Sequence, residues 1–198
     1  MSEFLHDAEY RTESWKRRHS PEAIAQLGVW RWKGIQSHST QILDAICGKR
    51  VIDFGGADGP LGFGSIIVDA KAEAKTFDDV DGRIEGVFTS HALEHLDDPQ
   101  AWLESAYARL DSGVCLIVHL PANTCRLWRA GQYANPNQPS GHRHTFCLST
   151  DLGLPEGEWW DRIDSMVSMA GFDLELVEYC GDDSIILFAR KPQLTATT

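Results

Sequence analysis

Histidines and one glutamate are the residues of this chain best suited to acid–base chemistry. His91, Glu94 and His95 lie close together in the sequence, and a second pair of histidines begins at His142. A neutral imidazole accepts a proton readily near neutral pH. For a reaction in which a hydroxyl must lose its proton, we therefore take His91 and His142 as the candidate bases.

The run His91-Ala92-Leu93-Glu94-His95 also fits the H-x-x-E-H pattern of a class of zinc peptidases. Two histidines four residues apart share one face of a helix, so the pattern could hold a metal. A further ligand would have to come from downstream, from Glu175 or Glu178, and both fall in a predicted strand. The surrounding α/β pattern accounts for the run better, and we expect no metal in the site.

A glycine-rich turn and an acidic residue indicate a second kind of chemistry. The turn Asp53-Phe54-Gly55-Gly56-Ala57-Asp58-Gly59 follows one short apolar run, and Asp69 ends the next. Glycines let the backbone turn tightly and approach a ligand without a Cβ in the way. An acid at the end of the second strand can accept hydrogen bonds from both hydroxyls of a ribose. Each feature alone is also typical of a structural turn or cap, but together they favour a nucleoside ligand.

The composition is that of one ordinary globular domain with, at most, a short appendage. The 198 residues are 42% hydrophobic and 24% charged, with a formal net charge of −11. Such an acidic chain lacks the basic face that a nonspecific nucleic-acid binder needs, and it would be repelled by an anionic membrane surface. We therefore expect neither nucleic acid nor membrane insertion.

The cysteines and the first residues favour a cytoplasmic location. The five cysteines form no C-x-x-C pair, so reduced, buried thiols are expected rather than a disulfide framework or a zinc ribbon. The N-terminal residues are too polar for a signal peptide, and no apolar run approaches the ~18 residues of a membrane span.

Hydrophobic runs predict the elements that position these residues. Continuous apolar runs, typical of strands buried on both faces, occur at 50–54, 65–69, 86–90 and 114–120. Helices are predicted at 39–46, from the cap Asp98 to Leu110, and at 158–170, and a hairpin at 173–179 and 184–190. The fold class is therefore α/β, with a Rossmann-like, mostly parallel sheet and a C-terminal antiparallel hairpin.

In order and spacing these motifs resemble class I S-adenosylmethionine-dependent methyltransferases, in their small-molecule, type 11-like branch. The glycine turn matches that family's acidic-x-Gly-x-Gly-x-Gly motif, with Ala57 in place of the middle glycine, and Asp69 matches its ribose-binding acid. Ser90 to Pro99 matches the family's fourth-strand motif, and Ala170-Gly171-Phe172 matches its usual lead into the terminal hairpin. The resemblance covers about residues 48–190.

The resemblance implies S-adenosylmethionine as cofactor and methyl transfer to oxygen or nitrogen of a small-molecule or glycan acceptor. His91 and His142 are then the catalytic candidates. The residues expected at the cofactor are Asp53, Gly55, Gly56, Ala57, Gly59, Asp69, Ser90 and His91.

The chain departs from the family after the glycine turn. Only five residues, Pro60 to Gly64, separate Gly59 from the next run, whereas a crossover helix needs about ten or more. The sheet is therefore reduced by loss of its first crossover helix. A pyrophosphate relies on such a helix, whereas a sulfonium does not, and the carboxylates of Asp53 and Asp58 suit a cationic ligand. The same loss also fits a catalytically degenerate binding or scaffold protein.

Three segments follow from this pattern. Residues 1–47 are expected to form a helical N-terminal cap or lid, 48–191 the methyltransferase-like α/β domain, and 192–198 a flexible tail. The long segment Asn123 to Thr145 is expected to be a lid or binding loop, which could wall the acceptor pocket together with Trp30, Trp32 and Trp128.

Overall fold

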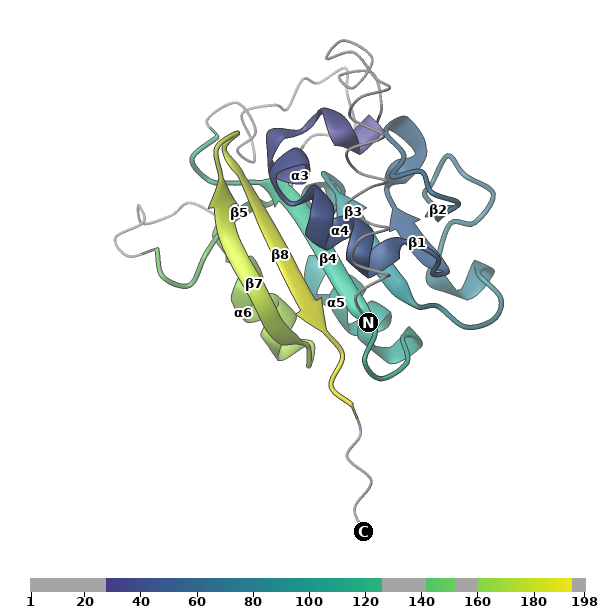
Figure 1. Ribbon diagram of the computed structural model, residues 1–198. Helices are drawn as coiled ribbons and strands as arrows, with labels where there is room; N and C mark the ends of the chain where they lie inside the picture. The colour runs from purple at the N-terminus through teal and green to yellow at the C-terminus, as the bar shows by residue number, and fades with distance from the viewer. Residues whose placement is uncertain (1–27, 126–141, 152–159, 194–198) are drawn as a thin grey trace, which may run out of the picture.

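A computed structural model describes residues 28–125, 142–151 and 160–193 and is built around one six-stranded sheet (Figure 1). The strand order is β2-β1-β3-β4-β8-β7, with β1 to β4 parallel and β8 and β7 antiparallel. The strands are β1 (Val51–Phe54), β2 (Ile66–Val68), β3 (Gly86–Ser90), β4 (Cys115–Pro121), β7 (Asp173–Cys180) and β8 (Ser184–Arg190). This confirms the predicted mostly parallel sheet with a C-terminal hairpin.

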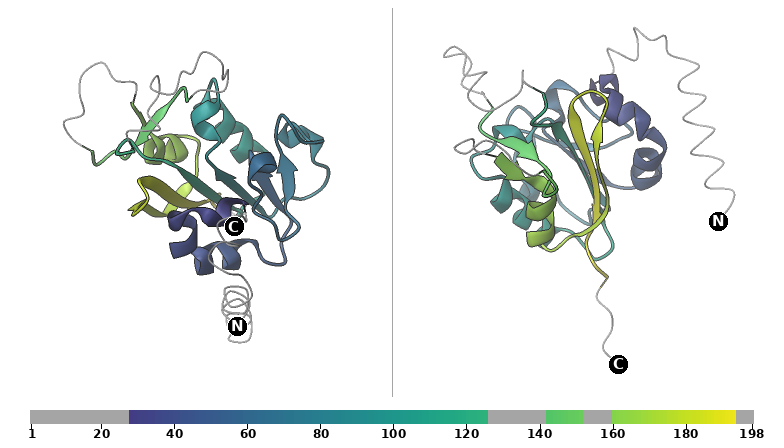
Figure 2. Two further views of the ribbon diagram at one scale, coloured as in Figure 1. Left: turned by 90° about the horizontal axis from the view of Figure 1, so that it is seen from above. Right: turned by 90° about the vertical axis from the view of Figure 1, so that its left-hand side faces the viewer.

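Helical elements cover both faces of the sheet (Figure 2). On one face lie η1 (Gly28–Arg31), α3 (Lys33–Ser37) and α4 (Ser39–Ile46), whose Ile35 and Ile42 are fully buried against strand residues such as Phe88. On the other lie α5 (Pro99–Arg109) and α6 (Ile163–Met169). Burial on both faces explains why the strands are continuous apolar runs.

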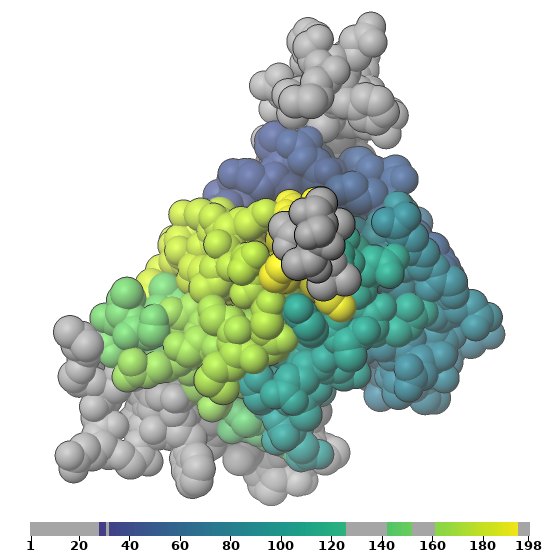
Figure 3. All heavy atoms as spheres, turned by 90° about the horizontal axis from the view of Figure 1, so that it is seen from below, coloured from purple at the N-terminus to yellow at the C-terminus, as the bar shows by residue number. Residues whose placement is uncertain are grey.

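The described N-terminal elements pack against one face of the sheet, in a hydrophobic cluster that they share with strand residues. Seen from below, these elements, coloured blue-purple, lie along one side of the molecule, next to the yellow-green C-terminal part of the chain (Figure 3). Residues 1–27 of the expected lid lie outside the described residues. No helix within the described part of the chain has the length and apolar character to span a bilayer.

The helix α5 begins where its cap was predicted. The side chain of Asp98 accepts a hydrogen bond from the backbone N–H of Ala101 at 2.9 Å, and Pro99 occupies the first turn, where its missing N–H costs nothing. The helix ends at Arg109, before Gly113, whose φ is +81°.

The connection between β1 and β2 contains no α-helix, as predicted. Its one helical element is η2 (Gly56–Asp58), a single 3₁₀ turn. Buried Leu61 packs against the N-terminal layer; its N–H donates to Oδ2 of Asp53, and its carbonyl accepts from Nε1 of Trp30 at 2.8 Å. In place of a helix, this connection has one buried apolar residue, Leu61, whose backbone is held by hydrogen bonds on both its N–H and its carbonyl.

The predicted helix at 158–170 is partly wrong. Trp160–Arg162 forms the strand β6, which pairs in parallel with β5 (Thr145–Cys147), and the helix begins only at Ile163. The pairing partner lies in a distant part of the chain, so tertiary contact overrides the helical pattern here. Residues 126–141, which include Trp128 and most of the expected binding loop, lie outside the described residues.

Candidate functional site

A cavity of about 660 Å³ lies at the carboxyl ends of β1, β2 and β3. This is the edge at which an open parallel sheet binds ligands, and the volume is within the range of small-molecule sites. The lining residues are Gly28, Val29, Trp32, Phe54, Gly55, Asp58, Gly59, Asp69, Ala70, Lys71, Lys75, Ser90, His91, Ala92, His95 and Leu96.

Five of the eight residues predicted at the cofactor line this cavity: Gly55, Gly59, Asp69, Ser90 and His91. Gly55 adopts a φ of +80°, and a Cβ built on it would lie 2.4 Å from the Cβ of Ala92. Only glycine fits that close approach, because it combines a left-handed backbone with no side chain.

Asp53 is buried and is not among the residues that line the cavity. It is 1% exposed, and its Oδ2 accepts the backbone N–H of Leu61 at 2.7 Å. Burial raises the pKa of Asp53 to about 6; the bond from Leu61 opposes this rise, and the negative charge of Asp69 adds to it. Gly56 makes room for this carboxylate, since a Cβ there would lie 2.2 Å from Oδ2. Neither Asp53 nor Gly56 nor Ala57 is among the residues that line the cavity.

The acidic lining expected from the sequence is not formed. Lys71 pairs through Nζ with Asp58, and its backbone N–H donates to Asp69 at 2.8 Å. With Lys75 also at the wall, two lysines face two aspartates among the lining residues. The aspartates and lysines among these lining residues therefore balance in charge.

His91 lies at the wall of the cavity in an uncommon conformation. Its φ is +52°, a left-handed value that costs a non-glycine residue energy and recurs at functional sites. The ring of Trp32 stacks on its imidazole, with centroids 4.2 Å apart and planes at 14°. Nδ1 of His91 lies 3.4 Å from Oε1 of Glu94.

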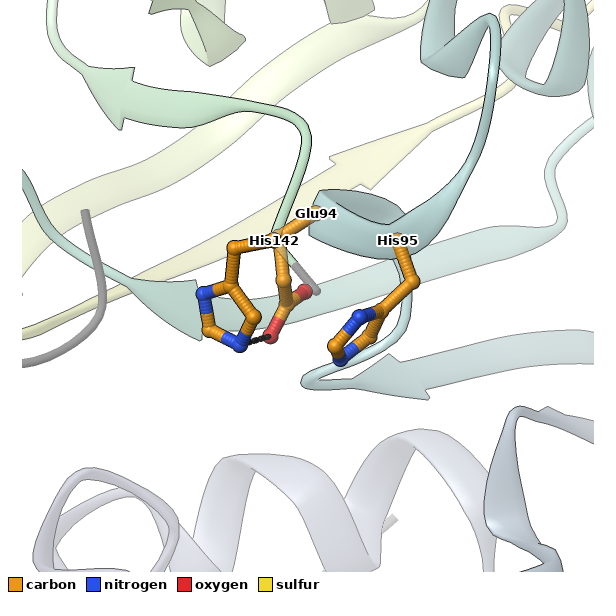
Figure 4. Close-up of side chains that lie close together, drawn as sticks. All are labelled: Glu94, His95 and His142. Carbon is orange, nitrogen blue, oxygen red and sulfur yellow. Dashed lines mark ion pairs between the residues drawn. The ribbon is translucent and has the colours of Figure 1, made fainter. Parts of the chain in front are cut away.

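His142 lies behind this wall, next to Glu94 and His95 (Figure 4). Nε2 of His142 is 4.0 Å from Oε1 of Glu94, and its ring meets that of His95 edge to face at 4.6 Å. Of the two predicted bases, only His91 is among the cavity-lining residues, and His95 lines the cavity too.

The peptidase geometry suggested by H-x-x-E-H is absent from the described residues. His91 and His95 do not share a helix face, because η4 (Leu93–His95) is a single 3₁₀ turn. The two suggested additional ligands are engaged elsewhere: Glu175 pairs with Arg190 at 2.5 Å and Glu178 with His38 at 2.7 Å.

A buried polar chain that the sequence did not predict starts at the cavity. Ser90 Oγ and Nδ1 of His119 are 2.9 Å apart, and Nε2 of His119 is 2.9 Å from Oγ of Ser184. Ser184 donates to Asp182, which also accepts the backbone N–H of Gly34 at 2.9 Å. Burial lowers the pKa of His119 to about 3, so it stays neutral. The one available signal was a histidine inside an otherwise apolar strand.

Comparison with known proteins relates the chain to others through structure. No family model matches it, and no curated sequence matches it. A chain in the complex of the Haloferax volcanii Trm112 methyltransferase activator with a methyltransferase superposes with a TM-score of 0.50, at 13% identity, over 81% of this chain and 93% of that one. A structure described as an S-adenosylmethionine-dependent methyltransferase from Listeria monocytogenes gives a TM-score of 0.50 at 15% identity, over 81% of this chain and 99% of that one.

This chain has the class I S-adenosylmethionine-dependent methyltransferase fold. At these identities the likeness concerns the fold alone. Within that fold, the cavity lies at the edge where the glycine turn ending β1, the acid ending β2 and the histidine motif ending β3 come together.

Proposed function

We propose that this chain transfers a methyl group from S-adenosylmethionine to oxygen or nitrogen of a small-molecule or glycan acceptor. The observation that supports this most is the cavity of about 660 Å³ between Gly55, Asp69 and His91. It opens at the ends of the strands that bind ligands in such sheets, and the glycine turn contributes Gly55 and Gly59, which have no side chains, to its lining.

The residues present fit the cofactor. Gly55 and Gly59 offer backbone without side chains, and Asp69 at the cavity wall would accept the ribose hydroxyls. Ser90 and His91 face the same space from β3. When bound, S-adenosylmethionine supplies a methyl group already activated by the sulfonium, so the protein's task is alignment and exclusion of water.

His91 is the candidate base for an acceptor hydroxyl. A proton on Nδ1 facing Glu94, 3.4 Å away, leaves Nε2 as the atom that would accept the hydroxyl proton as the acceptor oxygen gains the methyl group. Nε2 is buried in this structure, so the acceptor has to displace part of its cover to reach it. Trp32 holds the ring by stacking, so we also propose that the N-terminal segment 1–47 acts as a cap, through Gly28, Val29 and Trp32 at the cavity wall.

Binding of S-adenosylhomocysteine to the full chain, measured by calorimetry, tests the proposal. We expect saturable binding, and we expect Asp69→Asn to weaken it by about 1–3 kcal/mol, the scale of a lost hydrogen bond to a charged group. Asp78→Asn removes an exposed carboxylate of η3 (Phe77–Asp79) that does not line the cavity, and it should leave affinity unchanged. Absence of binding at millimolar ligand would contradict the proposal.

His91→Ala is expected to slow methyl transfer by about 10²–10⁴-fold while changing affinity for S-adenosylhomocysteine far less, because a lost proton acceptor acts on the chemical step. Transfer of labelled methyl to a panel of hydroxylated sugars and phenols gives the rate. An unaltered rate with an accepted substrate would exclude His91 as the base.

A binding or scaffold protein on the same fold is the second candidate, favoured by the shortened β1–β2 connection. It predicts either no binding of S-adenosylhomocysteine or binding without transfer to any acceptor. The same calorimetry and transfer assays therefore separate the two functions.

A further inference from the structure

Glu94 is a buried carboxylate without an adequate partner. Its side chain is 0% exposed, and neither oxygen has a hydrogen-bond donor among the residues that the structure describes. Burial raises the pKa of Glu94, whereas its interactions with His91 and His95 lower it, and the net direction is downward. A buried charge is costly unless another charge compensates it.

The charges that could compensate it are imidazoles. Within the described ranges, the ion-pair partners of Glu94 are His91 at 3.4 Å and His142 at 4.0 Å. The neighbouring guanidinium of Arg143 turns away to pair with Asp97. Nδ1 of His95 is buried and has no hydrogen-bond partner among the described residues.

Glu94, His95 and His142 converge from two segments (Figure 4). One ligand atom from each lies within 4.8 Å of the other two. The backbone N–H of Arg143 donates to the carbonyl of Glu94 at 2.7 Å, so the segment that carries His142 is tied to the turn that carries the other two.

We propose that Glu94, His95 and His142 bind a divalent transition metal of the zinc class. Two imidazoles and one carboxylate are a recurrent zinc ligand set that leaves a fourth position open. Tetrahedral zinc with bonds near 2.0–2.1 Å holds its ligand atoms about 3.4 Å apart, so side-chain shifts of roughly an ångström close the present arrangement. This ligand set differs from the two histidines of the H-x-x-E-H pattern, because His142 replaces His91.

The position suggests a use for the open coordination site. His95 lines the same cavity as Asp69 and His91, so the metal would lie at the wall of that cavity. A metal there could bind an acceptor oxygen and make its hydroxyl more acidic. That role rests on the proposed methyl transfer, whereas metal binding itself does not.

Metal titration of the untagged full chain tests the site. After chelator treatment and dialysis, Co²⁺ is added while visible absorption is followed, and Zn²⁺ is then added as competitor. We expect about one Co²⁺ per chain with the intense d–d bands of a tetrahedral site, abolished by Zn²⁺. Glu94→Gln and His142→Ala should each weaken binding by more than about tenfold, the effect that loss of a ligand's supporting contact already produces.

His38→Gln is the matched control. His38 is also a buried histidine paired with a glutamate, Glu178, at 2.7 Å, but it lies outside the cluster. The His38→Gln variant should therefore bind Co²⁺ with the same affinity as the unmodified chain. If Glu94→Gln fails to fold by circular dichroism, His95→Gln takes its place.

The proposal is overturned if no saturable Co²⁺ or Zn²⁺ binding occurs. That result would mean that protonated imidazoles, and no metal, compensate the charge of Glu94. It is overturned equally if His142→Ala binds as tightly as the unmodified chain, or if His38→Gln loses as much affinity. Calorimetry with S-adenosylhomocysteine on the same samples keeps the two proposals separate: metal binding without nucleoside binding rejects only the methyltransferase function, and the reverse rejects only the metal site.

Discussion

Gly55→Ala is expected to destabilise the protein by roughly 2–4 kcal/mol. At a φ of +80° an alanine pays the cost of a left-handed backbone, about 1–2 kcal/mol. The new Cβ also lies 2.4 Å from the Cβ of Ala92, an overlap that must push the β1 turn away from the β3 turn. Urea unfolding followed by circular dichroism measures the loss.

Two further variants separate the two contributions. Gly62 has nearly the same φ, +82°, but a Cβ at this position would meet nothing within 4 Å, so Gly62→Ala should show the backbone cost alone. Adding Ala92→Gly to Gly55→Ala removes the overlap and should restore stability to about the level of Gly62→Ala. Equal losses of stability in Gly55→Ala and Gly62→Ala would show that the overlap with Ala92 does not contribute to the destabilisation.

Asp53→Asn is expected to stabilise the protein at neutral pH, by up to about 3 kcal/mol. The pKa of Asp53 rises from 3.8 to about 6 on folding, because burial penalises its charged form. Between these values the folded chain retains a proton that the unfolded chain has lost, so the wild-type contribution to stability falls as pH rises from about 4 to 6. Asparagine has no such penalty and can still accept the N–H of Leu61 through its amide oxygen.

The pH dependence distinguishes this mechanism from a general packing effect. The gain of Asp53→Asn over wild type should be near zero at pH 4 and full at pH 7.5, as measured by the free energy of unfolding at both values. Asp58→Asn alters an exposed carboxylate paired with Lys71 and should show no comparable gain. A loss of stability at pH 7.5, or a gain of equal size at both pH values, would contradict the buried-charge explanation.

Local patterns in the sequence determined the scaffold. The apolar runs around Ile52 and Ile117 specify strands buried on both faces, because only such strands lack a polar side. Asp98 followed by Pro99 specifies the start of α5, because a side-chain acceptor and a missing N–H both satisfy the first turn. The short run Pro60 to Gly64 excludes a crossover helix by length alone. Each of these depends on residues close in sequence.

The tertiary structure decided what no local pattern contains. The buried position of Asp53 depends on Leu61, which donates to its carboxylate and is itself held by Trp30. The charge of Asp58 is balanced by Lys71, and the strand at Trp160–Arg162 forms because it pairs with β5. The same holds for Glu94, which reads in the sequence as part of a helical zinc motif but is buried in a 3₁₀ turn facing His142. Charge and coordination depend on distances between side chains far apart in the chain, and only folding sets those distances.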